Sequence, residues 1–298
     1  MSVALASLRH NLGSAVTDAL DDPDVIEIML NDDGSLWIDS FTKGMEKVAE
    51  IDAANAASIL NIVASILGTV VTKEKPVVEG ELPLDGSRFE GLFPPVVARP
   101  SFTIRKKALK VFTLTDYVSA KIMTPEEKEA IENAVREKKN ILVVGGTGSG
   151  KTTLSNAILA ELSESCGEDR IVIIEDTLEL QCVSTNKVQL RTTPTTTMQH
   201  LLKATMRLRP DRIVVGEVRD GAALDLLKAW NTGHPGGLCT VHANSCSGGL
   251  LRLQQLISEV SQSPMKELID EAVDLVIFIA KTPEGRRIKE ISETDNLI

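Results

Sequence analysis

A glycine-rich loop at residues 145–152 narrows the choice of folds for this chain more than any other segment. It reads Gly-Gly-Thr-Gly-Ser-Gly-Lys-Thr and matches G-x-x-x-x-G-K-[ST] at every fixed position. The apolar run Ile141–Val144 precedes the loop, and a helix is expected over Thr153–Leu162. This strand–loop–helix order is the context that a phosphate-binding loop requires, because inward backbone N–H groups and the helix N-terminus both attract anions.

The loop predicts binding of ATP together with Mg²⁺. The Lys151 ammonium would reach the β and γ phosphates, and the Thr152 hydroxyl would ligate the metal ion. The candidate nucleotide contacts are therefore Gly145, Gly146, Thr147, Gly148, Ser149, Gly150, Lys151, Thr152 and Thr153.

From residue 123 onward, short apolar runs alternate with helical segments. Thr124, Pro125 and Glu127 mark a helix start, with a capping Thr, Pro in the first turn and Glu three residues after the cap. The alternation predicts an α/β fold with a parallel or mixed sheet flanked by helices. The expected strands are Ile141–Val144, Ile171–Ile174, Ile213–Val215, Leu238–Val241 and Leu275–Ala280.

The first hundred residues predict a separate, smaller α+β domain. Val25–Leu30 and Ser35–Asp39 flank a turn sequence and predict a hairpin. A helix is expected over Ala53–Thr72, and residues 73–100, dense in Pro and Gly, are expected to be loop-rich before a strand at Ser101–Arg105. We assign the N-terminal domain to residues 1–108, a linker to 109–122 and the α/β domain to 123–298.

Hydrolysis needs a carboxylate that orients or deprotonates the attacking water, and such groups are expected where parallel strands end. One expected strand runs into Glu175 and Asp176, with Glu179 close behind, and another runs through Gly216 into Glu217. Each acid taken alone is as compatible with a helix cap or a surface charge as with a catalytic role. Arg219, beside Glu217, is as compatible with a salt bridge as with a direct role in catalysis. His242 follows a third strand, where a lone His is as often structural as functional.

Composition limits the functional class. The chain has 298 residues, with 32 basic and 42 acidic side chains and a net charge of -10, which argues against a broad grip on nucleic acid. The helix expected over Ala53–Thr72 contains no charged residue. Its polar residues form one stripe, which indicates a core helix and not a membrane span. Four cysteines without a Cys-x-x-Cys pair favour a reduced, cytoplasmic protein without structural zinc.

Four segments together resemble the Walker A, Asp box, Walker B and His box of secretion traffic ATPases. In chain order they are Gly145–Thr152, Ile174–Glu179, Leu208–Arg219 and Thr240–Asn244. Glu27–Asn31 and residues 85–106 are similar to the N-terminal domain of that family. The compact chain looks most like the TrbB-type conjugal transfer ATPases of type IV secretion systems.

This resemblance implies a RecA-like ATPase domain preceded by the smaller α+β domain, in a hexameric ring whose nucleotide lies between the two. It implies that Glu217 is the catalytic carboxylate, that Glu175 and Glu179 help to place metal and water, and that Thr152, Glu175 and Glu217 surround Mg²⁺. His242 would link nucleotide state to domain movement. Arg88 and Arg105 would approach the nucleotide, and one or the other would neutralise charge in phosphoryl transfer.

The resemblance also implies partners among the inner-membrane components of a secretion or conjugation apparatus. The chain would work in the cytoplasm, peripherally associated with the cytoplasmic face of that membrane. Pilus-retraction and type II secretion ATPases remain alternatives, as does a nucleotide-gated scaffold. A nucleic-acid translocase is supported only by the basic run Arg105–Lys110 and is disfavoured by an aromatic content of 3%.

Overall fold

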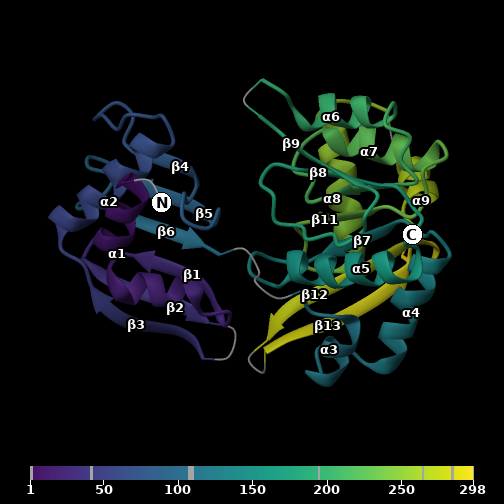
Figure 1. Ribbon diagram of the computed structural model, residues 1–298. Helices are drawn as coiled ribbons and strands as arrows, with labels where there is room; N and C mark the ends of the chain where they lie inside the picture. Colours follow the sequence, from purple (N-terminus) through teal and green to yellow (C-terminus); the bar gives the residue numbers. More distant parts are fainter. Residues whose placement is uncertain are drawn as a thin grey trace. The chain divides into compact units, whose positions relative to one another are not determined.

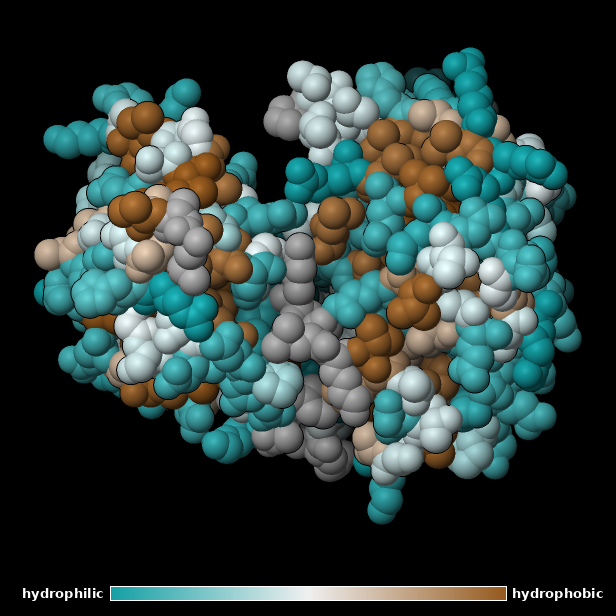
Figure 2. Space-filling model, viewed as in Figure 1, coloured by the Kyte–Doolittle hydropathy of each residue, from teal (hydrophilic) through white to brown (hydrophobic). Residues whose placement is uncertain are grey.

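The computed structural model describes residues 3–40, 43–106, 111–193, 195–263, 265–282 and 285–297. The chain forms two compact units, Met1–Lys110 and Val111–Ile298, each with its own sheet and helices (Figure 1). Within the described ranges, no helix is both long and apolar enough to span a membrane. Hydrophilic side chains cover much of the visible face of each unit, with groups of apolar side chains between them (Figure 2).

The N-terminal unit is an antiparallel six-stranded sheet with two helices. Its strand order is β3-β2-β1-β6-β5-β4, and Ile28, Leu36 and Phe89 of the sheet share one apolar core with α1 and α2. The elements are α1 (Val3–Asp21), β1 (Val25–Leu30), β2 (Ser35–Ser40), β3 (Gly44–Glu50), α2 (Ala53–Ile66), β4 (Val77–Glu81), β5 (Arg88–Leu92) and β6 (Ser101–Arg105).

Two expectations for this unit were wrong in extent. The helix predicted over 53–72 ends at Ile66, because Gly68 takes a left-handed φ of 70° that breaks the helical path. The stretch expected to be loop-rich contains β4 and β5, in which Val78 and Phe89 are buried. Pro and Gly around these short strands concealed their alternation, while α2 packs into the core as predicted.

The second unit is the predicted α/β domain. Its seven-stranded sheet has the order β13-β12-β7-β11-β10-β8-β9, and only the β12–β13 pair is antiparallel. The strands are β7 (Ile141–Val144), β8 (Ile171–Glu175), β9 (Lys187–Arg191), β10 (Arg212–Val215), β11 (Leu238–Val241), β12 (Leu275–Thr282) and β13 (Gly285–Glu293). All five predicted strands are present, and β9 and β13 were not anticipated.

Helices cover both faces of this sheet, as Figure 1 shows. On one face lie α6 (Met198–Thr205), α7 (Ala222–Asn231), α8 (Cys246–Ser258) and α9 (Lys266–Ala272). On the other lie α3 (Leu114–Ser119), α4 (Pro125–Arg136) and α5 (Lys151–Ser165). Successive side chains of β7 enter opposite cores, which explains why its four residues are all apolar.

Local capping signals account for the start of this unit. The predicted capping box is confirmed, since the Thr124 hydroxyl accepts from the Glu127 N–H and the Glu127 carboxylate accepts from the Thr124 N–H. The linker expected over 109–122 was too long. A second capping box at Thr113 begins α3, and Leu114 and Tyr117 are buried in the core beside α4 and α5.

Arg212, the first residue of β10, is almost fully buried with 1% of its side chain exposed. Its Nε donates to Asp169 Oδ2 at 2.7 Å, and its two terminal nitrogens donate to the carbonyls of Val135 at 3.0 Å and Gly236 at 3.3 Å. Lys138 reaches the other oxygen of Asp169 at 2.9 Å. Arg212 therefore ties the end of α4 and the approaches to β8 and β11 to the start of β10.

Candidate active site

The phosphate-binding loop joins β7 to α5, as the sequence predicts. Gly148 and Gly150 have φ values of 70° and 99°, which side-chain-bearing residues rarely adopt. A Cβ at Gly145 would lie 2.4 Å from Ser149 Oγ and 2.5 Å from a backbone oxygen. Gly148 and Gly150 are thus required by backbone conformation, and Gly145 by close packing.

The N-terminus of α5 is suited to an anion. Gly150 provides no side-chain cap to α5, so within the described part of the chain no capping side chain occupies its first N–H groups. In addition, no hydrogen-bond partner for the buried Ser149 hydroxyl exists among the described residues. A phosphate would satisfy these donors and interact favourably with the helix dipole.

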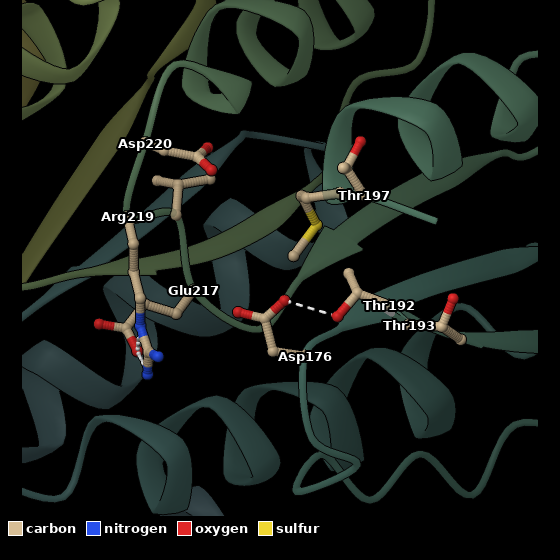
Figure 3. Close-up of a pocket in the computed structure, with 9 residues that line it drawn as sticks. Asp176, Thr192, Thr193, Thr197, Glu217, Arg219 and Asp220 are labelled. Carbon is tan, nitrogen blue, oxygen red and sulfur yellow. Dashed lines mark hydrogen bonds and ion pairs between the residues drawn. The ribbon is translucent and has the colours of Figure 1, made fainter. Parts of the chain in front are cut away.

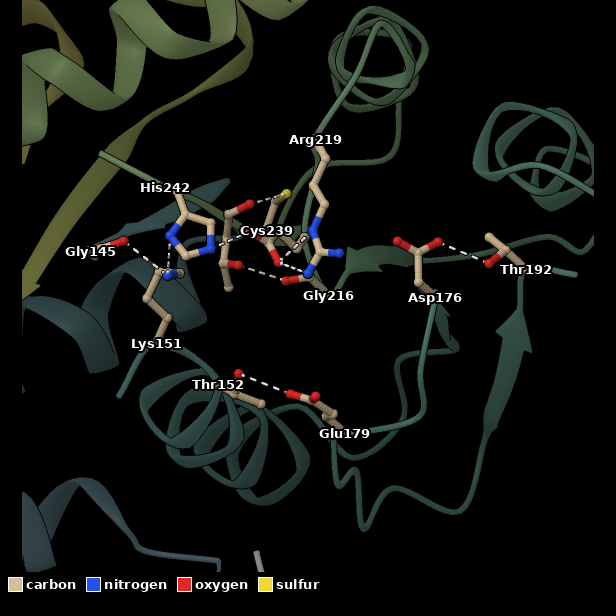
Figure 4. A network of polar contacts seen from close by, with 12 residues as sticks. Gly145, Lys151, Thr152, Asp176, Glu179, Thr192, Gly216, Arg219, Cys239 and His242 are labelled. Carbon is tan, nitrogen blue, oxygen red and sulfur yellow. Dashed lines mark hydrogen bonds and ion pairs between the residues drawn. The ribbon is translucent and has the colours of Figure 1, made fainter. Parts of the chain in front are cut away.

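Lys151 lies with its ammonium group inside the loop. It is 8% exposed, and its Nζ donates to the carbonyls of Gly145 at 2.9 Å and Gly146 at 3.1 Å. The same Nζ lies 3.1 Å from Nδ1 of His242 (Figure 4). The loop carbonyls and this imidazole therefore hold the ammonium where the phosphates of a bound nucleotide would be expected.

The surroundings of His242 assign its tautomer. Partial burial, and next the charge of Lys151, lower the pKa of the imidazole, so the ring is neutral near pH 7. Because an ammonium can only donate, Nδ1 must accept from Lys151 and the ring proton is on Nε2. Nε2 lies 2.8 Å from Glu217 Oε1, close but not aligned as a hydrogen bond. His242 thus stands between the phosphate loop and the strand-end acid.

Glu217 follows β10 and is held from both sides. Its Oε2 accepts from Arg219 through Nη2 at 2.6 Å and Nε at 3.0 Å, while its Oε1 faces His242. The carbonyl of Gly216 accepts from Thr240 Oγ1 at 2.8 Å, which fixes the backbone just before the acid. The structure thus brings three predicted site residues, Lys151, His242 and Glu217, into one series of contacts with Arg219.

The other predicted acids occupy different positions. Glu175 is 3% exposed, and its Oε1 accepts from the backbone N–H groups of Glu179 and Leu180, each at 2.9 Å. Glu179 Oε2 accepts from Thr152 Oγ1 at 3.4 Å. Glu175 therefore shapes the loop that presents Glu179, and Glu179 is the acid placed beside the candidate metal-binding hydroxyl.

A cavity of about 210 Å³ opens next to Glu217. Asp176 and Thr192 line it and are joined by a 2.9 Å hydrogen bond from Thr192 Oγ1 to Asp176 Oδ1 (Figure 3). Arg219 and Asp220 line the cavity from the β10 side. Asp176 is one of the acids that the sequence places at the end of β8, whereas Thr192, directly after the edge strand β9, carries no sequence signal that would select it.

Arg88 and Arg105, assigned by the resemblance, both lie in the N-terminal unit. They are cross-strand partners on β5 and β6, and Arg105 Nε is 3.6 Å from Glu27 Oε1. Like charges placed opposite each other destabilise a sheet, and Glu27 offsets the charge of Arg105. Lys107 and Lys110, of the basic run Arg105–Lys110, lie outside the described residues.

Comparison with known proteins gives consistent findings. Residues 17–284 match the family described as "Type II/IV secretion system protein". The chain is 52% identical to the "Probable conjugal transfer protein TrbB" of Sinorhizobium fredii, over 97% of this chain and 89% of that protein. It is 51% identical to the "Conjugal transfer protein TrbB" of Rhizobium radiobacter, over 95% and 88%. The crystal structure of the VirB11 ATPase from the Brucella suis type IV secretion system, in complex with sulphate, is 29% identical with a TM-score of 0.52, covering 99% of this chain and 96% of that one.

Proposed function

Because this chain belongs to the family of type II/IV secretion system proteins, we propose that it hydrolyses ATP to energise a type IV secretion system. Its task would be conjugal DNA transfer or assembly of the conjugal pilus. The names of the relatives at 52% and 51% identity favour conjugal transfer over pilus retraction or type II secretion.

The observation that carries the proposal is the series of contacts from Lys151 through His242 to Glu217. Phosphoryl transfer to water requires a lysine that binds the phosphates and a carboxylate that acts on the water. Here both groups contact the same imidazole, that of His242. A structural glycine-rich turn would need neither the buried ammonium nor the carboxylate. The geometry therefore supports hydrolysis rather than nucleotide-gated scaffolding alone.

In the proposed reaction, Glu217 acts on the attacking water. The water oxygen forms a bond to the γ phosphorus, and the bond from that phosphorus to the β–γ bridging oxygen breaks. The proton of the water passes to Glu217, and ADP leaves with the electron pair of the broken bond. The contact of two Arg219 nitrogens with Oε2 orients Glu217 before this transfer.

Lys151 would exchange partners when a nucleotide binds. Its present acceptors, the carbonyls of Gly145 and Gly146, are neutral, and phosphate oxygens are stronger acceptors because they carry charge. Movement of the ammonium toward phosphate removes the hydrogen bond to Nδ1 of His242. The orientation of His242, and with it the contact to Glu217, then depends on whether a nucleotide is present.

The residues present fit Mg²⁺ as the cofactor. The hydroxyl of Thr152 and the carboxylate of Glu179 are oxygen donors 3.4 Å apart, and this hard cation prefers a few protein oxygens together with water and substrate phosphates. When bound, Mg²⁺ neutralises charge on the β and γ phosphates. Glu175 would support this site by fixing the loop that carries Glu179.

The proposal includes a hexameric ring at the cytoplasmic face of the inner membrane, in contact with inner-membrane components of the apparatus. In the ring, the N-terminal unit would contribute to the nucleotide site and to assembly. The paired arginines Arg88 and Arg105 would supply positive charge to the transferred phosphate. Such an arginine contributes several orders of magnitude to phosphoryl transfer in related chemistry.

The test is ATP turnover by the purified chain across a concentration series, with molecular mass recorded in parallel. We expect Mg²⁺-dependent turnover that rises as a six-subunit species forms. Turnover by a monomer at a rate independent of concentration would contradict the proposed hexameric ring. An absence of turnover in every assembled form would contradict the proposed ATPase activity. Salt-sensitive DNA binding lost on Arg105→Ala would instead favour a translocase.

A further inference from the structure

The hairpin of β12 and β13 lies directly against the phosphate loop, although the motif gives no hint of it. A Cβ at Gly145 would lie 2.5 Å from the carbonyl oxygen of Ile279, and one at Gly150 would lie 3.6 Å from Ile279 Cδ1. Both ends of the glycine loop thus meet the same residue of β12. The hairpin is part of the wall that holds the loop.

Arg286, near the start of β13, extends from this hairpin over the loop. Its Nη2 donates to the carbonyl of Gly148 at 3.4 Å. A Cβ at Gly150 would lie 3.0 Å from Arg286 Cδ and 3.3 Å from its Nε. The arginine therefore touches Gly148 and Gly150, the two left-handed glycines of the loop.

This contact bears on the direction of the loop amides. A peptide plane that turns its C=O outward turns the following N–H inward, and phosphate binding depends on inward N–H groups. The Gly148 carbonyl is held by Arg286. The next N–H, of Ser149, donates across the loop to the Gly146 carbonyl at 3.3 Å.

The cross-strand pairing of the hairpin does not favour this arginine. Arg286 is paired across the strands with Lys281, and two cations directly opposite each other destabilise a sheet. Arg286 nevertheless lies next to a loop built for anions. Its neighbour Arg287 is paired with Ala280 and, as the next residue in the strand, faces the other side.

We propose that Arg286 is a positioning residue of the nucleotide site, which holds the Gly148 carbonyl and thereby keeps the Ser149 N–H turned into the loop, so that the loop retains the shape that binds phosphate. This inference rests on the proposed ATP binding. It concerns a residue that is 138 positions from Gly148 in the sequence and outside all four motifs.

The test measures the dissociation constants of Mg·ATP and Mg·ADP by calorimetry on the full chain. The variants are Arg286→Ala, Arg286→Lys and, as the matched control, Arg287→Ala. We expect Arg286→Ala to weaken both nucleotides equally, by about fivefold, the effect of one lost hydrogen bond. Turnover at saturating ATP should stay within about twofold, since the chemical groups are untouched. Arg286→Lys should recover part of the loss, and Arg287→Ala should bind like the wild type.

Unchanged affinity in Arg286→Ala would overturn the proposal. A loss for ATP but not for ADP would also overturn it, because Arg286 would then contact the γ-phosphate directly. If Arg286→Ala does not fold, Arg286→Lys decides, since it keeps the stem over Gly150 and loses the fork. Failure of the wild type to bind ATP would refute the proposed function instead, so the two outcomes are distinct.

Discussion

The two ends of β10 carry the same chemical pair in different surroundings. At the start of the strand, Arg212 meets Asp169 with side-chain exposures of 1% and 15%. Beyond its end, Arg219 meets Glu217 with exposures of 56% and 17%. The shortest nitrogen–oxygen distances are similar, 2.7 Å and 2.6 Å. Distance alone therefore does not distinguish a structural ion pair from one at a reaction centre.

The further contacts of each arginine and acid distinguish the two ion pairs. Arg212 also donates to two backbone carbonyls, so its removal would leave several buried acceptors unsatisfied. Arg219 can leave Glu217 for water, and the acid still contacts His242 through its other oxygen. The buried pair is thus fixed by its surroundings, while the exposed pair is able to exchange partners during a reaction.

Glu217→Gln should have the largest effect. The amide keeps the size of the side chain but does not accept a proton at neutral pH, so turnover should fall about a thousandfold, within the range of general base catalysis. ATP should remain bound, as retention of labelled ATP after rapid filtration would show. Lys151→Ala is the contrasting control, because it should lose the bound nucleotide. Wild-type turnover in Glu217→Gln would refute the assignment of the base.

Arg212→Met should produce the largest loss of stability. Removal of one partner of a buried ion pair leaves an uncompensated charge, and a loss of about 3 kcal/mol in the free energy of unfolding is expected, since Lys138 still faces Asp169. Urea unfolding followed by Trp230 fluorescence in a Trp37→Phe background reports on the second unit alone, because Trp230 is buried in its core.

Arg252→Met is the control for this change. Arg252 lies on α8 in an exposed contact with Gln255, and its replacement should alter the free energy of unfolding by less than about 0.5 kcal/mol. Equal stability of the Arg212 and Arg252 variants would remove the distinction between the ends of β10.

The pH dependence of stability should identify Asp169 as the acid of the buried pair. Burial raises the pKa of this carboxyl, but hydrogen bonds from Arg212 and Lys138 outweigh it and hold the pKa below its ordinary value of 3.8. A lowered pKa in the folded state stabilises the fold above the unfolded value, and the contribution disappears as pH falls through the folded pKa.

Asp169→Asn should therefore cost about 2 kcal/mol near pH 6, measured by the same urea unfolding. The difference from the wild type should shrink as pH falls below 3.8. A difference that stays constant down to about pH 3 would mean that the carboxylate charge does not contribute to the pair.

The sequence predicted what depends on neighbouring residues. Central strands of the second sheet such as β7 and β8 are largely continuous apolar runs because both of their faces are covered, and the capping box at Thr124 needs only four residues. The edge strand β9 was missed because Val188 and Leu190 are only partly buried between polar residues. The sharing of roles between Glu175 and Glu179, and the approach of Arg286 to Gly148, depend on tertiary contacts that no local pattern encodes.

The smallest effect is expected at the exposed end of β10. Arg219→Gln should change the free energy of unfolding by less than about 0.5 kcal/mol, because an exposed ion pair contributes little. Turnover should nevertheless fall about fivefold, since Glu217 Oε2 loses the guanidinium that orients it. Arg219→Lys should recover part of that rate, because it keeps the charge without the two-nitrogen contact.

Thermal unfolding and steady-state turnover of the Arg219 variants provide both measurements. Faster turnover in Arg219→Gln would mean that Arg219 restrains the base and does not prepare it. A loss of stability as large as that of Arg212→Met would mean that the two pairs are equivalent. The expected result is an Arg219→Gln enzyme that is slower but has an unchanged unfolding temperature. That result would assign the pair beyond the end of β10 to chemistry, in contrast to the buried pair at its start, which serves folding.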